Sequence, residues 1–323
     1  MQITRNKIFS VIGIILLIGY AITVWWSIEP DILEPETLQN DRGEQVIGYA
    51  TTSSLIDTLE SLLDKPGGWL SNDIMPPSVM MDNMPAFEFG ALEQSRDLAL
   101  IMRKEFSRSQ SQSTADTDLL AAQSKLNIEH TSWLVPSAEG EYREAIKLLK
   151  LYRAKISDTE NSNAQFYARA DNLNEWLKEV QKRLGSMSQR LSASVGQERL
   201  NTDLAGDSTA RQSTPSFASS EIKTSWWKID DVLYESRGSA WALLNFMKAI
   251  EVDFADVLEK KNAEVSLRQI IRELEATQQT VWSPMVLNGN GFGLVANHSL
   301  VMANYISRAN AAVIDLTNLL SQG

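Results

Sequence analysis

The chain of 323 residues contains no cysteine and only two histidines, His130 and His298. The absence of cysteine excludes disulfide bonds and thiolate zinc sites. Two histidines leave little for histidine-based metal binding or proton transfer. Basic residues are also few, because 41 acidic residues outweigh 30 basic ones and give a net charge of −11 at pH 7. This acidity argues against nucleic acid as a partner and against adhesion to an anionic lipid surface.

Charge is absent from residues 8–28, a mostly apolar run from Ile8 to Ile28. The run is long enough to cross a bilayer as a helix. Trp25 and Trp26 stand where an interfacial aromatic belt would fall. A cleaved signal peptide is the alternative, but the run is long and no small-x-small cleavage site follows it, so a retained anchor in the lipid bilayer is favoured.

The charges on either side of the run predict its orientation. Arg5 and Lys7 precede it, whereas Glu29 and Asp31 follow it. The excess of basic residues on the first side places the N-terminus in the cytoplasm. We therefore expect a single-pass membrane protein with most of its chain outside the cytoplasm. The predicted parts are a cytoplasmic tail at 1–7, an anchor at 8–28, a tether at 29–45 and an exported domain at 46–323.

The exported part shows helical rather than strand periodicity. Apolar residues recur at steps of three and four in 142–156, 166–191 and 226–257, and again after Asn297, which is placed to cap a last helix. We expect a break near Asn262, because one helix over 226–281 would be long for a compact domain. Residues 192–225 are rich in Ser, Thr, Gly and Asp and are predicted to form a mobile linker. The predicted fold is all-α, an N-terminal transmembrane helix followed by an elongated α-helical bundle with long loops.

Several long motifs carry a family resemblance. They include GGWLSNDIMPP, DNMPAFEFG, SWWKIDDVLYESRGSAWALL and VWSPMVLNGNGFGLVANHSLVMANYISRANAA. From about Gly67 to Leu320 the chain resembles the bacterial domain of unknown function 2333 family. The resemblance implies a proteobacterial single-pass inner-membrane protein. It implies no activity, and it supplies no catalytic residues to carry over.

The stretch GGWLSNDIMPPSVMMDNMPAFEFG, residues 67–90, holds the candidate chemistry. Turn formation explains its Asx residues before proline, with Trp69, Phe87 and Phe89 fixing the loop to the bundle, and this structural interpretation is favoured. Paired carboxylates would instead suit a glycosidase-like reaction, and thioethers would suit Cu(I). The carboxylate candidates are Asp73, Asp82 and Glu88, the copper candidates are Met75, Met80, Met81 and Met84, and a Ca²⁺ set of Asp73, Asp82 and Asn83 matches no EF-hand spacing.

Two further motifs have a structural and a functional interpretation. The Gly-rich segment 288–293 follows no strand and precedes no Lys-Ser/Thr, so a turn is favoured over a phosphate-binding loop, and we expect no cofactor. Trp226 and Trp227 could contact a partner, as could Trp69, but packing in the core is favoured for the Trp226–Trp227 pair.

The sequence thus favours a non-enzymatic adaptor or scaffold that binds another envelope protein, with a second copy of the chain left open as a partner. A seven-residue tail leaves no room for a cytoplasmic output domain. The alternatives are an envelope hydrolase or glycan-binding enzyme that uses the carboxylates of 73–88, and a small-ligand or copper-binding module.

Overall fold

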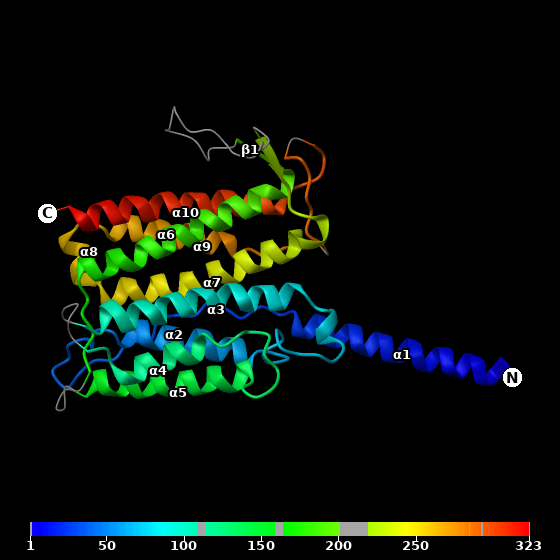
Figure 1. Ribbon diagram of the computed structural model, residues 1–323, viewed down its shortest axis with the longest axis horizontal. Helices are drawn as coiled ribbons and strands as arrows, with labels where there is room; N and C mark the ends of the chain where they lie inside the picture. Colours follow the sequence, from blue (N-terminus) through cyan, green and yellow to red (C-terminus); the bar gives the residue numbers. More distant parts are fainter. Residues whose placement is uncertain are drawn as a thin grey trace, which may run out of the picture.

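The computed structural model describes residues 2–108, 114–158, 164–200, 219–283, 285–291 and 293–322. Over these residues the fold is an all-α bundle, as the sequence predicts (Figure 1). The α-helices are α1 (Gln2–Trp26), α2 (Tyr49–Asp64), α3 (Asn83–Ile101), α4 (Thr117–Leu126), α5 (Ala138–Ser157), α6 (Ala170–Ser192), α7 (Ile229–Asp253), α8 (Ala255–Lys260), α9 (Glu264–Thr277) and α10 (His298–Ser321). Short helical turns are η1 (Ser78–Met80), η2 (Met102–Phe106, a π-helix), η3 (Ala193–Val195) and η4 (Trp226–Lys228).

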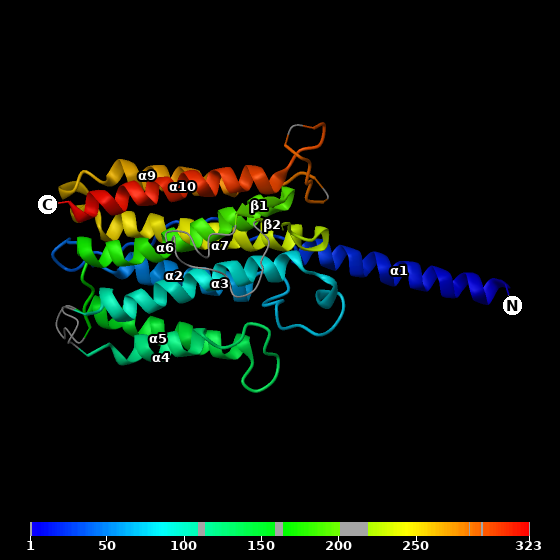
Figure 2. The ribbon, with the colours of Figure 1, turned by 45° about the horizontal axis from the view of Figure 1, so that its top comes forward.

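Helix α1 stands apart from the other helices. It projects from one end of the bundle as a straight rod in both views (Figures 1 and 2). Its residues Lys7–Trp26 are the one segment of the described chain that is long and apolar enough to cross a membrane as a helix. Trp26, at its end, packs against the hydrophobic core, so that α1 meets the bundle without a gap.

The helix boundaries follow local capping chemistry. The Asn297 side chain accepts a hydrogen bond from the Leu300 amide at 2.8 Å and begins α10, as predicted. The predicted break near Asn262 is confirmed, because α8 ends at Lys260, α9 begins at Glu264, and Asn262 has a φ of 51°. An earlier break at Phe254 was not predicted. Asn161, Ser162 and Asn163, candidate caps for the helical pattern over 166–191, lie outside the described residues.

Helix α4 was not predicted from the sequence. It has ten residues and buries only Leu119, Ala122 and Leu126, which is too short an apolar series to stand out. Asp116 caps its start by accepting hydrogen bonds from the Asp118 and Leu119 amides.

The two central helices, α3 and α7, cross at very close range. A Cβ on Gly90 would lie 1.9 Å from the Glu235 carbonyl oxygen, and one on Gly238 would lie 2.0 Å from the Phe87 carbonyl oxygen. Each helix therefore needs glycine where the partner's backbone passes. Helices α2, α4 and α5 lie on one side of this pair, and α6, α9 and α10 lie on the other (Figure 1).

The segment predicted as a tether lies along α7. The Leu33 amide donates to the Asn245 side chain at 3.1 Å, the Trp241 indole donates to the Asp31 carbonyl at 3.0 Å, and Lys248 pairs with Glu34 at 2.8 Å. Residues 29–34 therefore hold a defined course on the bundle surface.

The predicted linker at 192–225 is described only in part. Strands β1 (Gln197–Leu200) and β2 (Ser219–Ile222) pair antiparallel beside the bundle, with Gln197 opposite Ile222. Residues 201–218, between the strands, lie outside the described residues. The core residues that the structure describes come from the helices and their connections.

Candidate functional site

Four connections lie at the end of the bundle from which α1 projects. Helices α2, α4, α6 and α9 finish at this end, and α3, α5, α7 and α10 begin there (Figures 1 and 2). The connections are residues 65–82, 127–137, 193–228 and 278–297. Most of the candidate residues from the sequence therefore lie at one end of the molecule.

The three candidate carboxylates do not share a cleft. Glu88, on α3, is fully buried, whereas Asp73 and Asp82 are exposed. Asp82 caps α3 and accepts from the Asn83 amide at 3.0 Å. An acid that no substrate can reach cannot work with a partner on the surface, so the geometry gives a two-carboxylate hydrolase no support.

Glu88 holds the preceding loop instead. Its carboxylate accepts the Leu70 amide at 2.9 Å and the Ser71 amide at 2.8 Å. The Lys65 ammonium, also buried, lies 2.7 Å from it. Burial raises the pKa of the Glu88 carboxyl, and Lys65 and the amides oppose that rise. This arrangement satisfies a buried charge and fixes the start of the 65–82 loop.

Trp69 strengthens the same attachment. It is buried, its indole donates to the His130 carbonyl at 3.0 Å, and its ring meets that of Tyr142 edge-on at 5.2 Å. Phe87 is buried beside Trp241, and Phe89 lies against the His130 ring. These contacts are those that the structural interpretation of the loop predicts, and they leave Trp69 without a surface to offer a partner.

The four methionines face different surroundings. Met75 and Met80 are exposed, Met81 packs on the core, and Met84 is buried in α3. The described residues contain no cluster of three or more His, Asp or Glu side chains that could hold a metal ion. No observation in the structure favours a copper or calcium site.

Trp226 and Trp227 are exposed, so the prediction that this pair packs in the core is wrong. Their rings meet edge-on at 4.9 Å, and Trp227 is 78% exposed. They form the short turn η4, which precedes α7, and so lie one turn before the apolar face of that helix begins at Ile229. With Asp82, Met285 and Val286 they border a shallow hollow.

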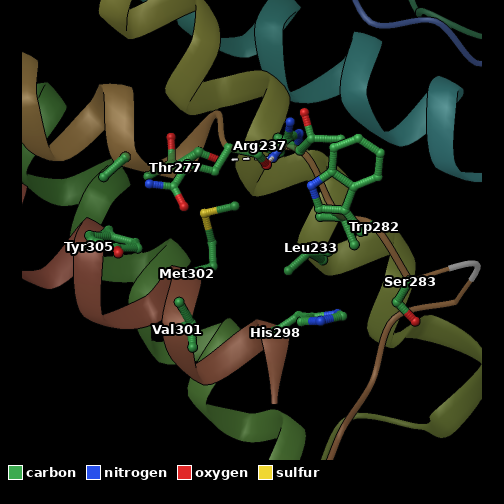
Figure 3. Close-up of a pocket in the computed structure, with 13 residues that line it drawn as sticks. Leu233, Arg237, Thr277, Trp282, Ser283, His298, Val301, Met302 and Tyr305 are labelled. Atoms are coloured by element: carbon green, nitrogen blue, oxygen red, sulfur yellow. Dashed lines mark hydrogen bonds between the residues drawn. The ribbon is translucent and has the colours of Figure 1, made fainter. Parts of the chain in front are cut away.

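An apolar pocket lies between α7, α9 and α10, beside the 278–283 connection, and has a volume of about 310 Å³ (Figure 3). Leu233, Val301, Met302 and Trp282 give it an apolar wall, and Met302 points from α10 toward α7 (Figure 3). Sequence reasoning missed this pocket, because its lining comes from three helices and no motif joins them.

Two polar side chains of this pocket, His298 and Arg237, already have hydrogen-bond partners. The His298 Nδ1 accepts the Leu287 amide at 3.2 Å, which places the proton of a neutral imidazole on Nε2. Arg237 donates to the Glu29 carboxylate and to the Thr277 and Gln279 carbonyls. No acidic residue is among the described residues that line the pocket, so no carboxylate there orients His298 or completes a relay to Ser283. The pocket can receive an apolar group, and its geometry supplies no acid–base pair.

The fold and the pocket define a helical-bundle protein with one apolar N-terminal helix and an apolar recess close to it. The chain belongs to the family described as an uncharacterised protein conserved in bacteria, DUF2333, which it matches over residues 2–323. The family resemblance seen in the sequence is thereby confirmed. No curated protein and no solved structure matches the chain.

Proposed function

We propose that the chain is a non-enzymatic adaptor of the bacterial cell envelope, anchored in the inner membrane by α1. In this proposal the bundle lies in the periplasm and binds an apolar segment of another envelope protein in the α7–α9–α10 pocket. The observation that carries the proposal is an open apolar pocket, free of acidic groups, beside the joint between α1 and the bundle.

The anchor and its orientation rest on charge and exposure. The apolar side chains of α1 from Ile8 to Trp25 are mostly exposed, a costly arrangement in water and a favourable one in lipid. Arg5 and Lys7 precede the apolar span, and Glu29 and Asp31 follow it, as expected for a cytoplasmic N-terminus. A signal sequence would share the length and composition of α1. The packing of Trp26 on the core favours a helix that stays attached.

The partner proposal rests on the chemistry of the pocket. A volume of about 310 Å³ suits one or two large apolar side chains or a short acyl segment. Trp282, which is 91% exposed, stands at the rim, where an aromatic side chain contributes strongly to binding when a partner covers it. Trp226 and Trp227 remain candidate contacts at the same end of the bundle.

Site-specific photocrosslinking in living cells tests this function. A crosslinking residue replaces Val301, which is exposed on α10 and lines the pocket, and the matched control replaces Ile314, which is exposed on the same helix outside the pocket. We expect a discrete adduct with one envelope protein from position 301, absent from position 314 and weakened by Trp282→Ala. Equal adducts from both positions, or none from 301, would contradict an adaptor site here.

A small apolar ligand is the second candidate, favoured by the same lining. Native mass spectrometry of the full chain, released from detergent, would then show a bound molecule of defined mass that Met302→Glu removes. A protein adduct from position 301 without any such mass favours the adaptor.

A further inference from the structure

Exposed apolar side chains gather at the end of the bundle from which α1 projects. They lie in parts of three connections, at residues 71–82, 226–227 and 281–297. The exposed residues are Ile74, Met75, Val79, Met80, Trp226, Trp227, Trp282, Met285, Leu294 and Val295. The opposite end exposes large apolar side chains singly in its described part, among them Val265 on α9. Exposed apolar side chains concentrated at one end of a molecule are typical of a contact with another phase or molecule.

One of the three connections carries no charged side chain. Residues 276–307, which include the whole 278–297 connection, contain no Asp, Glu, Lys or Arg in a chain with a net charge of −11. Transfer of this connection from water into a lipid interface therefore requires no desolvation of an ionised group. Lys228 directly follows the exposed Trp226–Trp227 pair, and Asp82 and Asp230 border the same hollow, so the charged groups of this region would stay at the level of the lipid headgroups.

The end of α1 is packed closely against the bundle. The apolar span ends at Trp26, and a Cβ on Gly67, in the 65–82 connection, would lie 2.8 Å from the Trp26 Cγ. Three residues later, Glu29 is paired with Arg237 near the start of α7. A bilayer that α1 spans thus has its surface beside the 65–82 connection, at the end of the bundle that carries the exposed apolar residues.

We propose that the three apolar connections at this end insert their tips into the interfacial layer of the bilayer that α1 spans, so that the bundle stands on the membrane. The inference rests on the proposed anchor and adds a second membrane contact to it. Tryptophan is favoured at this depth because its ring is apolar and its indole N–H is polar. Since α1 already confines the bundle to the surface, weak insertion of several tips is sufficient.

The 127–137 connection is not part of the proposed contact. It exposes Trp133, Leu134 and Val135, but its tip lies set back from the exit of α1 in both views (Figures 1 and 2).

The absence of cysteine permits a direct test on the full chain, because every introduced cysteine is the sole labelling site. Met80→Cys, Trp227→Cys and Leu294→Cys place a nitrobenzoxadiazole label at the tips. Val265→Cys is the matched control, since Val265 is 78% exposed at the opposite end and Met80 is 80% exposed. Leu16→Cys, within α1, reports the anchor independently.

Each labelled chain is reconstituted into phosphatidylethanolamine–phosphatidylglycerol vesicles that contain lipids with shallow or deep nitroxides. We expect blue-shifted emission from the three tips, with loss of intensity to the shallow nitroxide, and water-like emission from Val265. If Leu16 is quenched by the deep nitroxide but the tips behave like Val265, the inference is overturned and the anchor stands. Loss of quenching at Leu16 itself refutes the anchor and the inference with it. Tips that are shielded from both nitroxides and from aqueous iodide are covered by protein, a result that also overturns the inference.

Discussion

Arg237 on α7 holds the carboxylate of Glu29, three residues beyond the end of α1, at 2.7 and 2.8 Å from its Nε. Its other nitrogens donate to the Thr277, Gln278 and Gln279 carbonyls at the end of α9. One guanidinium with a side chain only 6% exposed therefore joins the chain leaving α1, the central helix and the rim of the pocket. Arg237 therefore links the residues that follow α1 to the bundle.

The first prediction concerns this joint. Arg237→Met leaves Glu29 and three carbonyls without their donor and is expected to lower the free energy of unfolding by about 3–5 kcal/mol. Glu29→Gln keeps the carbonyl contacts and should cost about 1–3 kcal/mol. Denaturant unfolding of the full chain in detergent micelles measures both.

The control for the joint is Glu34→Gln, which removes an ion pair with Lys248 in which Glu34 is exposed. We expect a change of less than about 1 kcal/mol. Equal losses in all three variants would show that the guanidinium network contributes no more than an ordinary surface pair.

The second prediction separates the three carboxylates of the 73–88 loop. Glu88→Gln removes the carboxylate that pairs with the buried Lys65 and should lower the free energy of unfolding by about 3–5 kcal/mol. Asp82→Ala removes the cap of α3 and should cost about 1 kcal/mol. Asp73→Ala should fall within about 0.5 kcal/mol of the parent chain. Thermal unfolding gives the order, and a loss of cellular function in Asp73→Ala without loss of abundance would restore the catalytic interpretation.

The third prediction is a pH dependence centred on Asp57 of α2. Burial, aided by the nearby Glu36 carboxylate, raises the pKa of Asp57 from 3.8 to about 6. The folded state then binds the proton more tightly than the unfolded state. The stability from this group is present below about pH 4 and is lost as pH rises through about 6.

Asp57→Asn cannot ionise and should show no such loss. Relative to the parent chain it should gain about 1 kcal/mol at pH 7.5, after allowance for solvent screening of a half-buried group, and little or nothing at pH 4. Urea midpoints at the two pH values provide the measurement. An equal effect at both would show that the Asp57 proton is not the cause.

The fourth prediction concerns the close crossing of α3 and α7. Gly90→Ala and Gly238→Ala each force a Cβ into the partner's carbonyl oxygen and should cost about 1–3 kcal/mol or more. Gly185→Ala in α6 is the matched control, because its nearest neighbour would be the Asn310 side chain at 3.9 Å. Alanine's higher helix propensity should there stabilise the chain by up to about 1 kcal/mol. Melting temperatures that fall in all three variants would point to a cause other than the crossing.

Local patterns predicted the parts of this protein that depend on near neighbours. The apolar period in 142–156 and 166–191 matches most of α5 and α6, although α6 begins only at Ala170. Asn297 and Asn262 were identifiable because a cap and a helix break use the residue's own side chain or backbone preference. Helix α4 escaped notice because three buried positions make too weak a period.

Burial was the quantity that sequence patterns predicted least well. Trp226 begins the apolar period of α7, yet Trp226 and Trp227 lie before the first apolar turn of that helix and are exposed. Glu88 resembles a surface acid in the sequence, yet Lys65 and the Leu70 and Ser71 amides surround it in the fold.

The sequence by itself determined the apolar span, the helical character and the family of this chain, since periodicity, capping and charge bias act over a few residues. Only the tertiary structure decided which groups meet. Glu29 and Arg237 are 208 residues apart in the chain, and nothing local to either of them indicates the other. The pocket and the apolar end of the bundle arise in the same way, from the packing of helices that no single segment specifies.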